Sequence, residues 1–234
     1  MRKYTQVKRV YFMNNIQIKI LLAFVLMPIV LGLMFFVPAG TINYWQGWAY
    51  ILVLTAPMIF VLLYFLKKDP EFLERRMRMK EKETKQQLII KISGGIFLIG
   101  FLIPGFDRYF GWSQIPDGIS FIAMIVVFLG YAMVFLTFKE NSYAGRTIEV
   151  EKGQYVISTG PYSIVRHPMY VGTSAMFLAT PIALGSYVAF PIFLLWIPLI
   201  IMRILNEEEV LKHELKGYEE YCNKTKYRLV PFIW

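Results

Sequence analysis

Long apolar runs with few charges constrain the fold of this chain more than any other feature. Six such runs are separated by turn-rich or strongly charged segments, and they lie at about 20–37, 48–66, 88–105, 118–138, 169–184 and 187–205. Hydrophobic residues make up 56% of the sequence, against about 45–50% in soluble domains. A bilayer core needs about 20 consecutive apolar residues per helix. We therefore predict an all-α, polytopic integral membrane protein with about five to six transmembrane helices.

Basic residues fall almost entirely in four segments between or beyond these runs. Of the 25 Lys and Arg, 23 lie before residue 20 or in 67–87, 139–167 and 203–234. Positive charge marks the cytoplasmic ends of membrane helices, so we place these segments and both termini in the cytoplasm. We expect a bacterial or archaeal inner membrane, with membrane lipids as partners. This topology explains the net charge of +9, and no motif supports a nucleic acid as a partner.

The same pattern divides the chain into two regions. Residues 1–138 are expected to form an N-terminal transmembrane region of four helices, in which 67–87 is interpreted as a cytosolic amphipathic segment. Residues 139–234 are expected to form a C-terminal region. Its last two apolar runs are joined by Leu184-Gly185-Ser186. They are expected to form a helical hairpin, either fully spanning or re-entrant.

The third apolar run contains several glycines, among them Gly94, Gly95 and Gly100. In membranes, small residues on a helix face let two backbones approach closely. We therefore interpret Gly94, Gly95 and Gly100 as packing sites rather than as part of a phosphate-binding loop.

A polar, turn-rich segment from Gly160 to Gly172 runs directly into the fifth apolar run. It contains Arg166-His167-Pro168-Met169-Tyr170. Proline is favoured at the first helical position because its missing N–H would have no partner there. The helix N-terminus that follows favours an anion such as a carboxylate, and His167 and Tyr170 can add hydrogen bonds and an aromatic face. These residues alone leave two interpretations open, a ligand site and a set of interfacial anchors.

A second polar point lies where the last apolar run ends. Arg203 and Glu207 are four residues apart, so they share one helix face and can pair. Acids at a membrane edge are costly unless they are solvated or engaged. We interpret Arg203 and Glu207 as functional residues, and Glu208 and Glu209 as parts of a solvated helix end.

Together these features resemble the isoprenylcysteine carboxyl methyltransferase family and its relatives, the membrane phospholipid methyltransferases. The resemblance rests on Tyr155 to Tyr162, on Arg166 to Gly172, and on Glu207-Glu208-x-x-Leu211 about 35 residues later. Tyr218-x-x-Tyr221 and the ending of the chain complete it. It covers roughly 139–234 and implies that this C-terminal region is a methyltransferase region that holds the cofactor pocket on the cytosolic side. The combination is more specific than the Arg-His-Pro motif alone.

The resemblance implies S-adenosylmethionine (SAM) as the methyl donor. It assigns Arg203 to the carboxylate of the acceptor and Thr147 to a polar cofactor contact. The residues that it assigns to cofactor binding are Gln154, Tyr155, Val156, Ile157, Tyr162, His167, Pro168, Met169, Tyr170 and Glu207. The chemistry agrees with these assignments, because a helix N-terminus suits the carboxylate of SAM, a glutamate its ammonium or hydroxyls, and tyrosine faces its sulfonium.

The main hypothesis is therefore a SAM-dependent methyltransferase that acts on a lipophilic acceptor, with the carboxylate of a prenylcysteine-like small molecule or prenylated protein as the reference substrate. Phospholipid amine or small-thiol methylation is the runner-up. A membrane NADPH reductase of the sterol type fits less well, because the Glu-Glu-x-x-Leu arrangement suits SAM. A non-enzymatic transporter would not gather its polar residues on the cytosolic side. His213 and Cys222 have no metal-ligand spacing, so no metal is predicted; the oligomeric state is left open.

Overall fold

The computed structural model describes residue 22 and residues 25–77, 84–145 and 147–234, and across these residues the structure is all-helical, without a strand. This confirms the predicted fold class. The basic leader, the start of the first predicted span and residues 78–83 of the predicted amphipathic segment lie outside the described residues.

The described helices follow the predicted apolar runs closely. The first is Val25–Ala39. It is followed by α2 (Trp45–Lys68), α3 (Pro70–Met77), α4 (Thr84–Phe110), α5 (Asp117–Glu140), the 3-10 helix η1 (Gly160–Ser163), α6 (Pro168–Ala183), α7 (Phe190–Leu194), α8 (Trp196–Glu214) and α9 (Tyr218–Lys224). The third predicted span is longer than expected, because α4 continues through Pro104 as far as Phe110.

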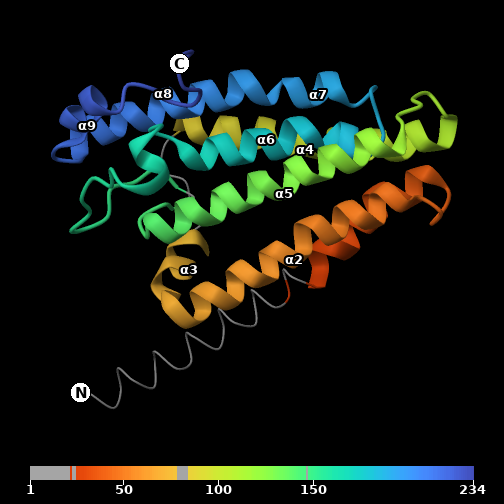
Figure 1. Ribbon diagram of the computed structural model, residues 1–234, viewed down its shortest axis with the longest axis horizontal. Helices are drawn as coiled ribbons and strands as arrows, with labels where there is room; N and C mark the ends of the chain where they lie inside the picture. Colours follow the sequence, from red (N-terminus) through yellow and green to blue (C-terminus); the bar gives the residue numbers. More distant parts are fainter. Residues whose placement is uncertain (1–21, 23–24, 78–83, 146) are drawn as a thin grey trace.

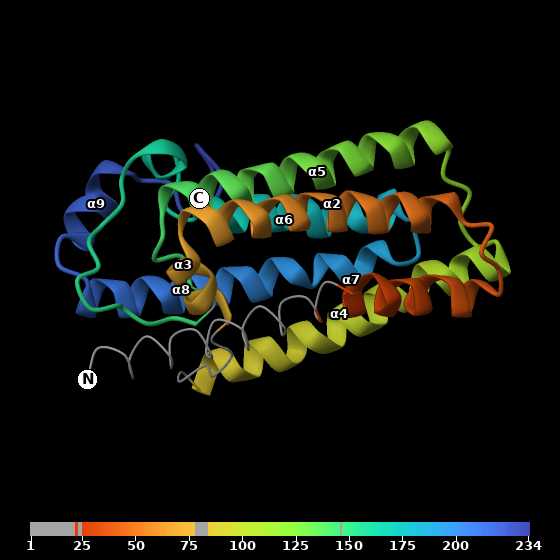
Figure 2. The ribbon, with the colours of Figure 1, turned by 90° about the horizontal axis from the view of Figure 1, so that it is seen from below.

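The long helices lie side by side, and the short helices α3, η1 and α9 gather at one end of the bundle (Figure 1). The view turned by 90° shows the same arrangement, with the α4–α5 loop and the turn before α7 at the opposite end (Figure 2). The basic segments in the described part therefore share one end with the polar motifs. This is the arrangement that the charge pattern predicts.

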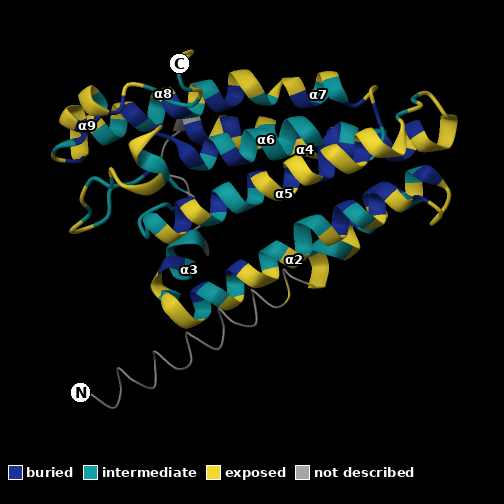
Figure 3. Ribbon diagram, in the orientation of Figure 1, coloured by how far each residue is buried: buried dark blue, intermediate teal, exposed yellow. Residues whose placement is uncertain are grey.

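Four described helical segments are long and apolar enough to cross a membrane. They are Trp45–Lys68, Gln86–Phe110, Asp117–Glu140 and Phe190–Glu214, the last of which joins α7 and α8. Their outer faces remain exposed in the structure (Figure 3), and large apolar side chains such as Leu52 and Ile122 are more than 60% exposed there. Water would not favour so much apolar surface, whereas a bilayer accommodates it. The chain is an integral membrane protein.

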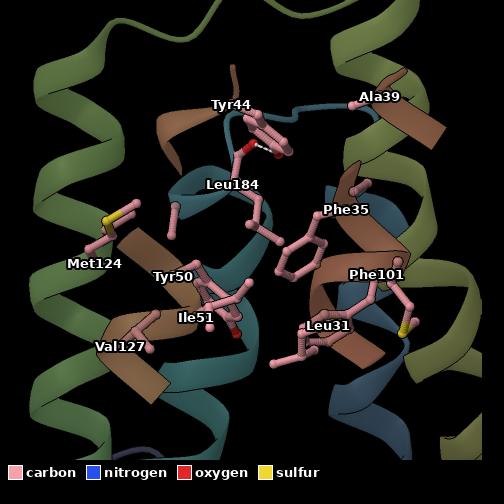
Figure 4. Packing of buried hydrophobic residues seen from close by; sticks show 14 of the residues in the cluster. Leu31, Phe35, Ala39, Tyr44, Tyr50, Ile51, Phe101, Met124, Val127 and Leu184 are labelled. Atoms are coloured by element: carbon pink, nitrogen blue, oxygen red, sulfur yellow. Dashed lines mark hydrogen bonds between the residues drawn. The ribbon is translucent and has the colours of Figure 1, made fainter. Parts of the chain in front are cut away.

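The apolar core lies toward the end of the bundle that is remote from α9. Phe35 and Val127 are fully buried, and Tyr50 and Phe101 pack edge to face within this core (Figure 4). The side chains come from the first described helix, α2, α4, α5 and the α6–α7 turn. This packing holds one end of the bundle together, so the polar residues at the other end project from a fixed frame.

The predicted C-terminal hairpin is present. Its turn at Leu184 to Ser186 is anchored on both sides, because the Tyr44 hydroxyl donates to the Leu184 carbonyl and the Ser186 hydroxyl donates to the buried Asp107 carboxylate. The arm α6 has 16 residues, which gives about 24 Å of helix, less than a bilayer core of about 30 Å. The arm α7–α8 is long enough to span.

The interpretation of the glycines in the third apolar run was wrong for two of them. A Cβ atom at Gly94 or Gly95 would meet nothing within 4 Å among the described residues, whereas one at Gly100 would lie 2.9 Å from the Phe193 ring. The closest helix approach involves Gly130 of α5 and Gly172 of α6, where an added Cβ would lie 2.5–2.6 Å from the carbonyl oxygen of the other glycine. Small residues therefore join α5 to α6.

Candidate functional site

The Arg-His-Pro motif begins α6 in the way that the sequence predicts. Pro168 is the first helical residue and His167 is the N-cap, although the His167 side chain makes no cap hydrogen bond. The two residues before the proline pair with the end of the chain, because the Arg166 amide donates to the Tyr227 carbonyl at 2.9 Å and the His167 amide donates to the Arg228 carbonyl at 3.0 Å. The C-terminal segment thus fixes the start of α6.

Glu208 is the centre of a buried ionic cluster, so its interpretation as a solvated residue was wrong. It is only 2% exposed. Arg166 Nε donates to its Oε1 at 2.7 Å, Arg228 Nε donates to its Oε2 at 2.9 Å, and His167 Nε2 lies 3.3 Å from Oε1. The neighbouring Glu209 is exposed, as predicted. Arg166 and Glu208 therefore hold the fold of this end, while the adjacent residues face the cavity described next.

Tyr170 joins the two predicted functional residues of α8. Its hydroxyl donates to Glu207 Oε2 at 2.5 Å and accepts a bond from Arg203 Nε at 2.9 Å. The predicted partnership of Arg203 and Glu207 therefore includes a bridging hydroxyl from α6. On its other side, Arg203 donates through Nη1 to Gln86 Oε1 of α4 at 3.1 Å. Three helices meet at this arginine.

A cavity at this end of the bundle brings the predicted site residues together. The cavity has a volume of about 100 Å³ and is partly open to solvent. All ten residues assigned to the cofactor line it, and so do Arg203 and Thr147. Their role in binding stays a prediction. Their convergence from the 143–157 segment, η1, α6 and α8 is a feature of the structure.

Further lining residues were not among the predicted site residues. They are Asn141, Tyr143, Ala144, Gly145, Ile148, Glu149, Arg166, Leu211, Leu215, Tyr218 and Tyr221. Tyr218 and Tyr221 are three residues apart and so lie on one face of α9. This spacing could have identified both as lining residues. The contribution of Asn141 to Glu149 had no such signal, because these residues form an irregular segment whose path depends on tertiary contacts.

The tyrosines of this wall are neutral hydrogen-bonding groups. Burial raises the pKa of each of the hydroxyls of Tyr162, Tyr218 and Tyr221 well above the usual range of a tyrosine. The Tyr162 hydroxyl accepts a bond from the Asn141 amide at 2.9 Å, and the Tyr221 hydroxyl donates to the Tyr162 carbonyl at 2.7 Å. The buried Tyr218 hydroxyl has no partner in the described part of the chain. A ligand with polar groups fits a wall with such an unsatisfied hydroxyl.

A second, largely apolar cleft adjoins this cavity between α4, α6 and α8. It has a volume of about 400 Å³ and shares four residues with the first cavity: Gly145, Met169, Tyr170 and Arg203. Its walls include Phe97, Phe177, Trp196 and Leu199. Among the described residues that line it, the only charged side chains are Arg76 and Arg203. The described lining is therefore largely apolar, with Arg203 where the cleft meets the first cavity.

The amphipathic helix α3 supports the boundary between the two cavities. Arg75 Nε donates to the Ser142 carbonyl at 3.0 Å, and Arg76 Nη1 donates to the Gly145 carbonyl at 2.8 Å. The Arg76 guanidinium also lies 4.5 Å from the centre of the Phe138 ring. The described part of the predicted amphipathic segment is thus helical, and it braces the wall that carries Gly145.

Comparisons with known proteins give a family match over part of the chain and two further similarities. Residues 119–217 match the family model described as phospholipid methyltransferase. The Delta(14)-sterol reductase of Mus musculus is 31% identical over 106 residues, which are 42% of this chain and 25% of the reductase. A third similarity is to the solved structure of a eukaryotic intramembrane Ras methyltransferase, isoprenylcysteine carboxyl methyltransferase. The two chains are 16% identical with a TM-score of 0.46, and the match covers 93% of this chain and 85% of the chain of that methyltransferase.

The fold defines the class of the chain as an integral membrane protein. Within it, residues 119–217 carry the sequence pattern of the phospholipid methyltransferase family, which confirms the resemblance for this part of the chain. The matched stretch contains all the predicted site residues, from Thr147 to Glu207. It leaves out Arg76 and Gln86, which reach the site from the N-terminal region.

Proposed function

We propose that this protein transfers the methyl group of SAM to a lipophilic acceptor that carries a carboxylate. The observation that supports this most is the junction of the two cavities at Met169, Tyr170 and Arg203. Methyl transfer is an in-line displacement, so donor and acceptor must meet end to end. A polar cavity open to solvent beside an apolar cleft provides separate places for a water-soluble donor and a lipid acceptor.

The first cavity has the groups that SAM needs. When bound, SAM supplies an electrophilic methyl on a sulfonium cation. Glu207 is partly exposed toward the cavity and is oriented by Tyr170, so it can accept from the ammonium or the ribose hydroxyls. The N-terminus of α6 favours the donor's carboxylate. Tyr170 and His167, whose rings stack at 5.6 Å, offer an aromatic face to the sulfonium.

The acceptor cleft favours a carboxylate over an amine or a thiol. A carboxylate is already ionised at neutral pH and needs no general base, whereas an amine or thiol must lose a proton. The cleft's described lining offers two arginines and no carboxylate or histidine of its own. Arg203 would orient the acceptor oxygen, and alignment and water exclusion would supply most of the catalysis. An S-prenylated cysteine combines such a carboxylate with an apolar chain.

The topology and the two regions of the chain remain part of this proposal. The shared position of α3, α9 and the first cavity at one end (Figure 1) supports a cytosolic site, where SAM is available. Positive-inside bias then places both termini in the cytoplasm. An origin in a bacterial or archaeal inner membrane and the division at residues 138 and 139 stay predictions.

Purified protein is expected to bind SAM and its demethylated product, and Glu207→Gln is expected to weaken that binding tenfold or more. Loss of one charge-assisted hydrogen bond is worth about 1.5–3 kcal/mol, and tenfold corresponds to about 1.4 kcal/mol. Isothermal titration measures both affinities. Glu209→Gln is the matched control, because Glu209 is exposed on the same helix.

Two results would contradict the proposal that SAM binds in the first cavity. Wild-type protein that binds neither compound would remove SAM as donor. If wild-type protein binds SAM and the Glu207→Gln and Tyr170→Phe variants bind it with the same affinity, these two residues do not bind the cofactor.

Arg203→Ala is expected to lower kcat/KM for an N-acetylated S-farnesylcysteine by about 10–100-fold, the range for losing a hydrogen bond to a charged group. SAM affinity should stay within about threefold, because Arg203 would hold the acceptor rather than the donor. A radiolabelled methyl transfer assay and a SAM titration measure the two quantities. If SAM affinity falls as far as turnover, Arg203 must be reassigned to the cofactor.

The match to a sterol reductase supports one second candidate, a reductase that binds NADPH in the first cavity and a sterol in the cleft. Its match covers a quarter of the reductase. Titration with NADPH distinguishes the two. Binding of NADPH without binding of SAM would establish the reductase alternative.

A further inference from the structure

Residues 229–234, which we call the return segment, lead from α9 back to the flank of α8. Trp234 packs against Ile200 and Ile204. Both isoleucines belong to the candidate membrane span Phe190–Glu214. Figure 1 shows the end of the chain above α8 and away from α9. A bilayer that surrounds this span therefore also reaches the return segment.

The return segment exposes two large apolar side chains. Phe232 is 88% exposed and Ile233 is 81% exposed. The span beside it exposes apolar side chains of its own, among them Met202 and Leu205. Exposed apolar surface of this kind marks a site of interaction with a protein or a membrane.

The backbone presents Phe232 at an energetic cost. The Ile233 amide donates to the Val230 carbonyl at 3.2 Å, which closes a turn. Pro231 is the second residue of this turn, and Phe232 is the third, with a φ of 66°. A turn with a positive φ at its third residue favours glycine or asparagine, and a bulky residue is rare there. Because glycine would suit this backbone better, we expect the Phe232 side chain to have a contact outside the protein that offsets the strain.

The residues around Phe232 are of the types that membrane–water interfaces favour. The centre of the Tyr227 ring lies 5.2 Å from that of the Phe232 ring, and Trp234 follows two residues later. Tyr and Trp are enriched at membrane interfaces. Lys224 and Lys226 are exposed just before this group, and basic residues near a membrane attract anionic headgroups. A bilayer surface therefore fits better than a second copy of this chain, whose matching surface would be basic as well.

The return segment is tied to the wall of the first cavity. The Trp234 backbone oxygen accepts from the Arg228 and Leu229 amides at 2.8 and 3.0 Å. The Arg228 carbonyl in turn accepts from the His167 amide at 3.0 Å, where α6 begins. His167 lines the first cavity, so a displacement of the return segment is transmitted to this wall.

We propose that the return segment is a membrane-interface anchor, in which Phe232 and Ile233 insert among the lipids of a bilayer and thereby hold the start of α6 in place. The anchor does not depend on the proposed function, because it concerns only the surroundings of the segment. Its effect on SAM affinity rests on the proposed function. Separate measurements test the two.

An environment-sensitive fluorophore, NBD, reports the surroundings of the return segment. It is attached to Ile233→Cys in a Cys222→Ser background, because Cys222 is the single cysteine of the sequence. The matched control carries the label at Asn223→Cys, which is exposed on α9. Both proteins are placed as single copies in nanodiscs of phosphatidylcholine and phosphatidylglycerol. Lipids with a nitroxide on the acyl chain near the headgroup should quench the label at position 233 several-fold more than the control, and aqueous iodide should quench it less.

Two results of this experiment would overturn the proposal. The first is equal quenching by the nitroxide lipid at positions 233 and 223, because the segment would then lie in water. The second is a label at position 233 that iodide reaches in single-copy nanodiscs but not in crowded liposomes, because a second copy of the chain would then cover the segment.

Phe232→Gly tests whether the anchor supports the first cavity. It removes the side chain and relieves the positive φ, so the variant is expected to fold. By isothermal titration in nanodiscs, it should bind SAM several-fold more weakly than wild type. Phe232→Leu keeps an apolar side chain at the same strained position and should bind SAM like wild type.

A merely structural turn predicts the reverse order of SAM affinities, because glycine suits this backbone and leucine does not. That order would overturn the proposal, and so would equal SAM affinity in wild type and both variants. If wild-type protein fails to bind SAM, the proposed function is removed, and the lipid quenching at position 233 still decides whether the anchor exists.

Discussion

Glu208→Ala is expected to destabilise the protein by about 3–5 kcal/mol, the usual effect of removing one partner from a buried ion pair. The side chains of Glu208 and Arg166 are only 3% and 6% exposed. Removal of the carboxylate leaves the Arg166 guanidinium buried without its counter-charge and takes one ion-pair partner from Arg228. The penalty arises from the charge left behind, since a well-made buried pair by itself adds little.

The loss should be concentrated where the chain ends. Arg166 Nη1 also donates to the carbonyls of Thr225 and Lys226 at 2.9 Å, so a displaced Arg166 releases the C-terminal segment from the start of α6. We expect a lower thermal unfolding midpoint in detergent and faster proteolysis after residue 214. SAM binding should weaken as a consequence, because His167 and Pro168 lose their support.

Glu209→Ala is the control for this prediction, because Glu209 is exposed one residue further along α8. Surface substitutions of this kind usually change stability by less than about 0.5 kcal/mol. Glu208→Gln should lie between the two, because it keeps acceptor and shape but loses the charge. Equal midpoints for the two alanine variants would show that the ionic cluster does not support the fold.

The contrast between Glu207, Glu208 and Glu209 also shows what a sequence can predict here. Helical spacing correctly separates Glu207 from Glu209 and turns Glu207 toward the face of Arg203. It cannot say that the face of Glu208 is covered, because the cover comes from Arg166 and from the end of the chain. That pairing depends on the path of the segment after α9. Sequence spacing contains no information about it.

The helices were predictable because a bilayer imposes a simple rule on each of them separately. Length and hydropathy predict α2, α4, α5 and α7–α8 without reference to their neighbours, and Pro168 marks the start of α6 locally. The residues assigned to the cofactor come from motif resemblance, and their role stays a prediction. Gln86 was not predicted, since a glutamine before an apolar run has many explanations and only the packing of α4 against α8 brings it to Arg203.

Gly172→Ala is expected to destabilise the protein by about 1–3 kcal/mol, the usual effect of overpacking a tight contact. The new Cβ would lie 2.5 Å from the Gly130 carbonyl oxygen and 2.9 Å from a Val134 methyl. The first of these atoms belongs to the backbone, so a rotamer change cannot relieve the clash and α5 and α6 must move apart. Gly172 lies one turn after Pro168, and α5 leads into Asn141 at the cavity wall. SAM affinity should therefore fall together with stability.

Gly95→Ala is the opposite case and serves as its control. In the part of the chain that the structure describes, a Cβ there would meet nothing within 4 Å, and alanine is more favourable than glycine inside a helix by about 1 kcal/mol. The two substitutions add the same methyl group to two membrane helices, yet thermal unfolding should show a lower midpoint for Gly172→Ala and an equal or higher midpoint for Gly95→Ala. Equal shifts in both variants would mean that helix propensity rather than the α5–α6 contact governs these positions. Opposite shifts, with SAM affinity reduced only in Gly172→Ala, would tie the close approach of α5 and α6 to the shape of the cavity.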